Sequence, residues 1–164
     1  MDSISLKLMT RELYHEMFKE WKTDAIIFSD NAVFEEFSYD KARVDRDFDS
    51  KQEKTRVVLA VMLDDKPIGE LELKHIKEET KECSLSIHMI NDNYKGKGYG
   101  TEAEKLGIKY AFEELKLEKV TADILHKNTR SQRVVEKIGF KCVSEDAEER
   151  HYEINREDYI RIYK

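Results

Sequence analysis

The sequence predicts a single α/β domain of the α+β kind, with a mixed and mostly antiparallel central sheet of six to seven strands flanked by about four helices. One observation is a run of three strand-like segments between residues 56 and 90, separated by polar turns, which indicates an antiparallel meander. Another is the alternation of helical and strand-like segments over residues 101–156. The chain has 164 residues and no low-complexity linker, so we expect one domain spanning residues 1–164.

The N-terminal part begins with alternating apolar and polar residues over 3–9, the pattern of a half-buried strand. Thr10 can cap a helix that begins at Arg11 and carries apolar side chains at helical spacing. Residues 29–55 are strongly charged, and we interpret them as a short helix and loop. The spaced apolar residues of the first helix are Leu13, Met17 and Trp21.

The meander separates apolar from polar side chains along each strand. In its last strand, Ile87 and Met89 face one way and His88 faces the other, because successive strand residues point to opposite sides. The strands are 56–63, 68–76 and 83–90, and the turns between them are 64–67 and 77–82.

Helical spacing returns at 101–116, where Thr101 and Glu104 have the arrangement of a capping box. A second helix near the C-terminus is ended by Gly139, since glycine is favoured just past a helix end. The remaining elements are a strand at 117–125, that helix at 129–138, and strands near 141–146 and 150–156.

Composition excludes several classes of function. The net charge of −6 argues against a nucleic-acid partner and is compatible with a cationic or amine substrate. No apolar run is long enough for a membrane span, and the first ten residues lack the pattern of a secretory signal, so we expect a cytoplasmic protein without a membrane partner. Cys83 and Cys142 lack metal-site spacing, so we expect no metal and two ordinary buried thiols, with a single disulfide between them as the alternative.

Residues 93–103, NYKGKGYGTEA, contain three of the six glycines of the chain. A glycine loop that leads into a helix leaves backbone N–H groups free to converge on an anion such as a phosphate. Lys95 and Lys97 add positive charge. A flexible helix entry without a ligand is the alternative. The phosphate-loop pattern GxxxxGK[ST] is absent, and GxGxG departs from the dinucleotide pattern GxGxxG.

A second motif, NTRSQRVVEKIGF, follows at residues 128–140. Together the two stretches resemble the GNAT superfamily of acyl-CoA-dependent N-acetyltransferases, in wording closest to the branch of ribosomal-protein N-terminal and spermidine acetyltransferases. The first family motif corresponds to Lys95-Gly96-Lys97-Gly98-Tyr99-Gly100, with lysine where arginine or glutamine is usual. The second corresponds to Asn128, Ser131, Gly139 and Phe140.

The resemblance implies a site for acetyl-CoA as co-substrate. In the family, the N–H groups of the glycine loop bind the coenzyme A pyrophosphate. The strand before the loop splays from its neighbour, and pantetheine lies in that gap. The basic stretch 126–133 suits the phosphates, although an ordinary solvated helix face remains the alternative. The expected cofactor-binding residues are Met89, Ile90, Lys95, Gly96, Lys97, Gly98, Tyr99, Gly100, Thr101, Asn128 and Arg133.

The catalytic groups are less clearly marked. Many family members carry a tyrosine that protonates sulfur at the position of Val135, so Ser131 is our candidate for serving the thiolate, with Tyr152 as an outside candidate. His88 is the candidate base, since its imidazole titrates near neutral pH. On the neighbouring strand, Glu70 and Glu72 are candidates for holding a water chain or the substrate ammonium; the alternative for these strand residues is a solvated surface. Asn128 also suits a helix N-cap.

The leading hypothesis is therefore acetyl transfer from acetyl-CoA to a primary amine by direct attack in a ternary complex. The acceptor could be a protein N-terminus, a polyamine, an amino acid or a drug, and acidic residues at 77–82 and 145–149 could attract it. The alternative is an acyl-CoA-binding regulatory or interaction module without turnover. A third hypothesis is a nucleotide-phosphate binder. Dimers are common in the resembled branch, so a homodimer is possible.

Overall fold

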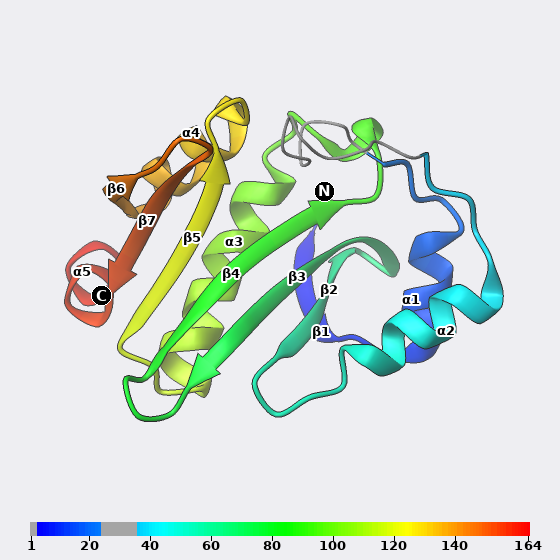
Figure 1. Cartoon of the computed structure of the whole chain (residues 1–164), viewed down its shortest axis with the longest axis horizontal. Helices are drawn as coiled ribbons and strands as arrows, with labels where there is room; N and C mark the ends of the chain where they lie inside the picture. Colours follow the sequence, from blue (N-terminus) through cyan, green and yellow to red (C-terminus); the bar gives the residue numbers. More distant parts are fainter. Residues whose placement is uncertain (1–2, 24–35) are drawn as a thin grey trace.

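The computed structural model describes residues 3–23 and 36–164. Their β-strands form one seven-stranded sheet in the order β1-β2-β3-β4-β5-β7-β6, as Figure 1 shows. Each neighbouring pair is antiparallel except β4 with β5. The strands are β1 (Ile4–Leu8), β2 (Val57–Leu63), β3 (Lys66–Lys77), β4 (Glu82–Met89), β5 (Lys119–Leu125), β6 (Lys141–Glu145) and β7 (Glu149–Asn155). The predicted mixed, mostly antiparallel sheet and its meander are confirmed.

Five α-helices lie within the described ranges, one more than expected, because the chain continues past the last strand into a helix with its own capping box at Asn155 and Asp158. A short 3₁₀ turn (Asp92–Tyr94) precedes the glycine loop, and a π-helical turn (Tyr110–Glu114) extends the third helix. The α-helices are α1 (Arg11–Phe18), α2 (Lys41–Ser50), α3 (Tyr99–Lys109), α4 (Thr129–Ile138) and α5 (Arg156–Tyr163). None of the helices in these ranges is long and apolar enough to cross a membrane.

The helices divide the hydrophobic core into two clusters on opposite faces of the sheet. One face packs against α1 and α2 through Tyr14, Met17, Val44 and Met62 among others. The other packs against α3, α4 and α5, and Figure 1 shows α3 lying behind β4. The segment 29–55, which we interpreted as a short helix and loop, contains α2, and Asp40 is the N-cap of this helix. Residues 29–35 of the segment lie outside the described residues.

Two details differ from expectation. The third helix begins at Tyr99 rather than after a Thr101 cap, because Gly98 adopts φ +84° and ψ 0° and is itself the N-cap. Thr101 and Glu104 therefore lie inside the helix, and Glu104 is buried. Both cysteines are free thiols, but Cys142 is exposed on the edge strand β6 while Cys83 is buried.

Candidate active site

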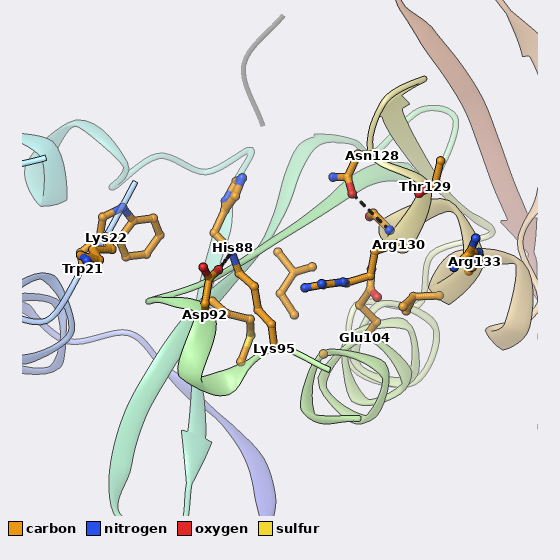
Figure 2. Close-up of a pocket in the computed structure, with 15 residues that line it drawn as sticks. Trp21, Lys22, His88, Asp92, Lys95, Glu104, Asn128, Thr129, Arg130 and Arg133 are labelled. Carbon is orange, nitrogen blue, oxygen red and sulfur yellow. Dashed lines mark hydrogen bonds and ion pairs between the residues drawn. The ribbon is translucent and has the colours of Figure 1, made fainter. Parts of the chain in front are cut away.

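A cavity of about 860 Å³ opens beside the C-terminal half of β4 (Figure 2). Strand β4 pairs with β5 only at Glu82, Cys83 and Ser84, and beyond them the two strands diverge. Residues from β4, the glycine loop, α3 and α4 line the cavity, together with Trp21 and Lys22 after α1. The sheet is thus splayed at this site, as the sequence motifs predicted.

The edge of β4 presents backbone groups to the cavity. The N–H of Ile90 donates to the carbonyl of Ile68, which sets the alternation of the antiparallel ladder. By that alternation the N–H and C=O groups of Ile87 and Met89 point away from β3, toward the gap. An extended amide chain could pair with them as an added strand does. Ile90 is a correction to the expected contacts: it is fully buried, and its own carbonyl accepts from the N–H of Lys22.

The glycine loop supplies hydrogen-bond donors at one end of the cavity. Gly96 and Gly98 have φ of +72° and +84°, a left-handed region that suits glycine. Within the described part of the chain, the N–H groups of Gly96, Lys97, Gly98, Gly100 and Thr101 donate to no protein acceptor. They include the first turn of α3, where unpaired donors favour an anion.

The two lysine side chains of the glycine loop differ in whether they reach the cavity. Outside its own helix turn, a Cβ added at Gly100 would meet no atom of the described residues within 4 Å, so the helix start leaves space beside the cavity. Lys95 lines the cavity and pairs with Asp92 at 3.1 Å. Lys97 is exposed and does not line it. The structure therefore brings Lys95, but not the Lys97 side chain, to the site.

Helix α4 forms the opposite wall. Asn128 is its N-cap and accepts a hydrogen bond from the Ser131 N–H at 3.2 Å, so the capping role weighed from the sequence is present (Figure 2). Asn128, Ser131 and Arg133 all line the cavity, as does Arg130. Val135 does not: it is 1% exposed and packs in the core.

Tyr152 is not brought to the cavity. Its ring is buried among core residues behind α4. Its hydroxyl donates to Glu136 at 2.7 Å. The Tyr152 side chain therefore does not face the residues that line the cavity.

His88 reaches the cavity from β4. Its ring centroid lies 6.4 Å from that of Trp21, and both side chains line the same wall (Figure 2). Burial lowers the pKa of the imidazole below its ordinary value, so the ring is neutral at pH 7 and able to accept a proton.

Glu70 and Glu72 are held away from the cavity, although Glu70 is the cross-strand partner of His88. The ammonium of Lys51 lies 3.2 Å from the Glu70 carboxylate and 2.9 Å from that of Glu72, and Arg56 reaches Glu72 at 3.4 Å. Burial raises the pKa of Glu70 to about 7, with Lys51 opposing the rise. Burial would also raise the pKa of Glu72, but Lys51 and Arg56 outweigh it and hold that pKa below its usual value. These carboxylates form an internal ion cluster beneath α2.

Comparison with known proteins identifies the family. The pattern that defines the Acetyltransferase (GNAT) domain matches residues 5–141. The chain belongs to the GNAT acetyltransferase family. This membership was predicted from the two motifs around Gly98 and Asn128.

Individual relatives of this GNAT chain agree with that assignment. It is 30% identical to the uncharacterized N-acetyltransferase YnaD of Bacillus subtilis, a match that covers 93% of this chain and 96% of YnaD. It is 38% identical over 77 residues to the probable N-acetyltransferase YjcK of the same organism, where the match covers 47% of this chain and only 42% of YjcK.

Solved structures share the GNAT fold at low identity. Aminoglycoside acetyltransferase AAC(6')-Ib in complex with acetyl-CoA and paromomycin has a TM-score of 0.80 at 18% identity and 99% coverage of both chains. A chimera of spermidine N-acetyltransferase SpeG from Vibrio cholerae and hSSAT has a TM-score of 0.77 at 15% identity, covering 96% of this chain and 98% of that one.

Several residues that line the GNAT cavity were missed by sequence reasoning, and Glu104 is the buried one among them. Glu104 lines the cavity from α3 and is 3% exposed, with no hydrogen bond or ion pair to another described residue (Figure 2). Burial raises the pKa of its carboxyl to about 8. The signal was available: placed inside the helix, Glu104 is one turn from Gly100 and shares its inward face.

Replacing Glu104 with glutamine should stabilise the fold increasingly as pH rises. The folded-state pKa lies above the ordinary value of 4.5, so the wild type loses stability as pH rises from about 4.5 toward 8, while the neutral amide does not. The difference in unfolding free energy between E104Q and wild type should widen by about 3 kcal/mol between pH 5 and pH 8. Urea unfolding at several pH values measures it, and a constant difference would contradict the buried neutral carboxyl.

Proposed function

We propose that the chain transfers an acetyl group from acetyl-CoA to a primary amine by direct attack in a ternary complex. The observation that carries the proposal is a continuous path between two features. One is the set of N–H groups of Gly96, Lys97, Gly98, Gly100 and Thr101, which have no acceptor among the described residues, and the other is the edge of β4 at Ile87 and Met89, which lies beyond the pairing with β5. A diphosphate suits the first of these features, and an extended amide chain suits the second. Coenzyme A carries both groups.

The residues present fit the coenzyme. The loop donors and the start of α3 would hold the pyrophosphate, and Gly100 leaves space for its approach. Arg130 and Arg133 on the opposite wall would add positive charge for the remaining phosphate. Ile87 and Met89 would pair with the pantetheine amides. Acetyl-CoA supplies the activated thioester when it is bound.

The chain's own contribution is to position the amine and to remove its proton. An ammonium has no lone pair, so the acceptor must be neutral when it attacks. His88 is neutral and lines the cavity, and we assign it the role of proton acceptor, directly or through one water. Alignment of the two substrates by the cavity walls supplies a further part of the rate.

The acceptor belongs to the primary amines: a protein N-terminus, a polyamine or another small amine. Trp21, Lys22 and Asp92 line the cavity near His88 and would meet it first. The carboxylates of Glu70 and Glu72 are already paired with Lys51 and Arg56 and do not line the cavity, so we do not assign them to ammonium binding. The structural relatives named for spermidine and for aminoglycosides define two acceptors to try.

The test is to incubate the protein with acetyl-CoA and a panel of spermidine, kanamycin and a short peptide with a free N-terminus. Released thiol is followed with a chromogenic reagent, and acetyl-CoA binding is measured by calorimetry. Thiol release that depends on an amine supports the enzyme. Binding without release on any amine would favour the alternative, an acyl-CoA-binding module. Competition by ATP for the acetyl-CoA site would favour the nucleotide hypothesis.

Replacing His88 with asparagine should lower kcat/KM about 100-fold at pH 7, because general-base assistance is lost. The acetyl-CoA affinity should be unchanged. His75→Asn is the matched control, since His75 is exposed on β3 and does not line the cavity. A wild-type kcat/KM in H88N would remove His88 from the mechanism.

A further inference from the structure

Glu104 lies at the end of the row of α3 residues that line the cavity. It lies one turn after Gly100, which lines the cavity beside the loop. One turn further, Gly107 closes the helix onto the sheet: a Cβ there would lie 2.8 Å from Leu71 Cδ1 and 3.3 Å from Leu85 Cδ1. Glu104 is therefore the last residue of this helix face before the cavity ends.

The end of the cavity marked by Glu104 is its inner end. Ile87 lines the cavity from β4, and Val134, Ser131 and Arg130 line it from α4. Pantetheine that enters from the loop along β4 would bring its sulfur toward this inner end. Glu104 is thus a buried polar side chain at the end of the cavity where the thioester would lie.

The cations around the cavity do not neutralise Glu104. Arg130 and Arg133 line the cavity from α4, and Figure 2 shows Arg130 extending into it, while His88, Asp92 and Lys95 line the cavity from β4 and the loop that follows it. No ion pair or hydrogen bond joins Glu104 to any of the described residues. Its carboxyl is kept neutral by desolvation alone.

We propose that Glu104 is the general acid of this enzyme and donates its carboxyl proton to the departing coenzyme thiolate. The inference rests on the proposed acetyl transfer. It assigns to α3 the role for which the sequence offered Ser131 on α4. The Val135 position is in the core and α4 contains no tyrosine, so Ser131 is the alternative donor on that helix, and a carboxyl is a much stronger acid than its hydroxyl.

The proton and electron balance is complete. The amine nitrogen forms a bond to the carbonyl carbon, the carbon–sulfur bond breaks, and its electron pair stays on sulfur. The Glu104 proton passes to that sulfur and leaves a carboxylate. His88 passes the proton of the substrate ammonium to solvent before the attack and then takes the second proton, which the nitrogen loses as the amide forms. Glu104 regains a proton from solvent as the thiol product leaves. An acid whose pKa is about 8 is close to the ordinary thiol value of about 8.5, which favours transfer in the transition state.

The decisive variant is Glu104→Gln, which keeps size and hydrogen bonding but cannot give up a proton. We expect kcat to fall about 100-fold while KM for acetyl-CoA stays within a factor of about two. The wild-type kcat should decline at alkaline pH as Glu104 ionises, and E104Q should lack that decline. Glu102→Gln is the matched control: it lies on the same helix, is paired with Lys105 at 3.5 Å and does not line the cavity. It should behave as wild type.

Three results would overturn the proposal. One is a wild-type kcat in E104Q. Another is a raised KM with unchanged kcat, which would make Glu104 a binding residue acting on the coenzyme or on Arg130. The third is an alkaline decline that persists in E104Q. Failure of the wild type to acetylate any amine would instead refute the proposed function, so the two failures are distinguishable.

Discussion

Replacing Gly98 with valine is expected to weaken acetyl-CoA binding about 1,000-fold, the loss of two charge-assisted hydrogen bonds. Gly98 has φ +84°, which a β-branched residue does not adopt without strain. Apart from its chain neighbours, no described residue has an atom within 4 Å of a Cβ placed there, so the effect comes from backbone conformation and not from a clash. The loop must rotate, which turns its N–H groups away from the phosphates. Isothermal calorimetry with acetyl-CoA measures the change.

Lys97→Val is the control for this variant. It places the same side chain on the neighbouring residue, whose backbone is not left-handed and whose side chain does not line the cavity. We expect only a small loss of affinity from the missing charge. Similar melting temperatures for both variants would show that they fold. Equal acetyl-CoA affinity in G98V and wild type would refute the role of the loop.

Replacing Lys51 with methionine is expected to lower the free energy of unfolding by about 3–5 kcal/mol. Lys51 is the shared partner of Glu70 and Glu72, whose side chains are 6% and 9% exposed. Without it, two buried carboxylates face each other with only Arg56 in support. The pKa values of both carboxyls then rise in the folded state. Folding therefore becomes less favourable as pH rises, and the loss of unfolding free energy in K51M should be smaller at pH 5 than at pH 8. Urea unfolding at the two pH values tests both statements.

The control variant removes the buried charges of Lys51, Glu70 and Glu72 together. In the triple variant K51M/E70Q/E72Q no buried carboxylate is left unpaired, and much of the lost stability should return. If K51M alone is as stable as wild type, the cluster is not what holds these carboxylates in the fold. They would then be free to serve the substrate, as the sequence suggested.

The alternating strands and the glycine-rich helix entry were predictable because they depend on neighbouring residues. The side-chain period of two marks β3 and β4, and the crowding of glycines before a helical pattern marks the anion site. The helix start was misplaced by two residues. Thr101 and Glu104 satisfy the pattern of a side-chain cap, but a left-handed Gly98 ends the preceding loop without one.

The roles of buried carboxylates depend on distant partners and were not predictable. Glu70 looked available on its strand, but Lys51 comes from the end of α2, in a segment whose pattern did not show that the helix would fold over β3. In the sequence, nothing distinguishes Glu104 from an ordinary solvent-facing residue of a helix. Only the divergence of β4 from β5 leaves a cavity beside it.

That divergence has a consequence for the kinetics of ligand entry. Since just three residues of β4 pair with β5, no sheet hydrogen bonds have to break when an extended molecule slides between these strands. The gap between β4 and β5 exists before the ligand binds, so little of the binding free energy is used to change the conformation of the protein. Association should therefore be a single concentration-dependent phase in stopped-flow mixing, without a slow isomerisation before or after it.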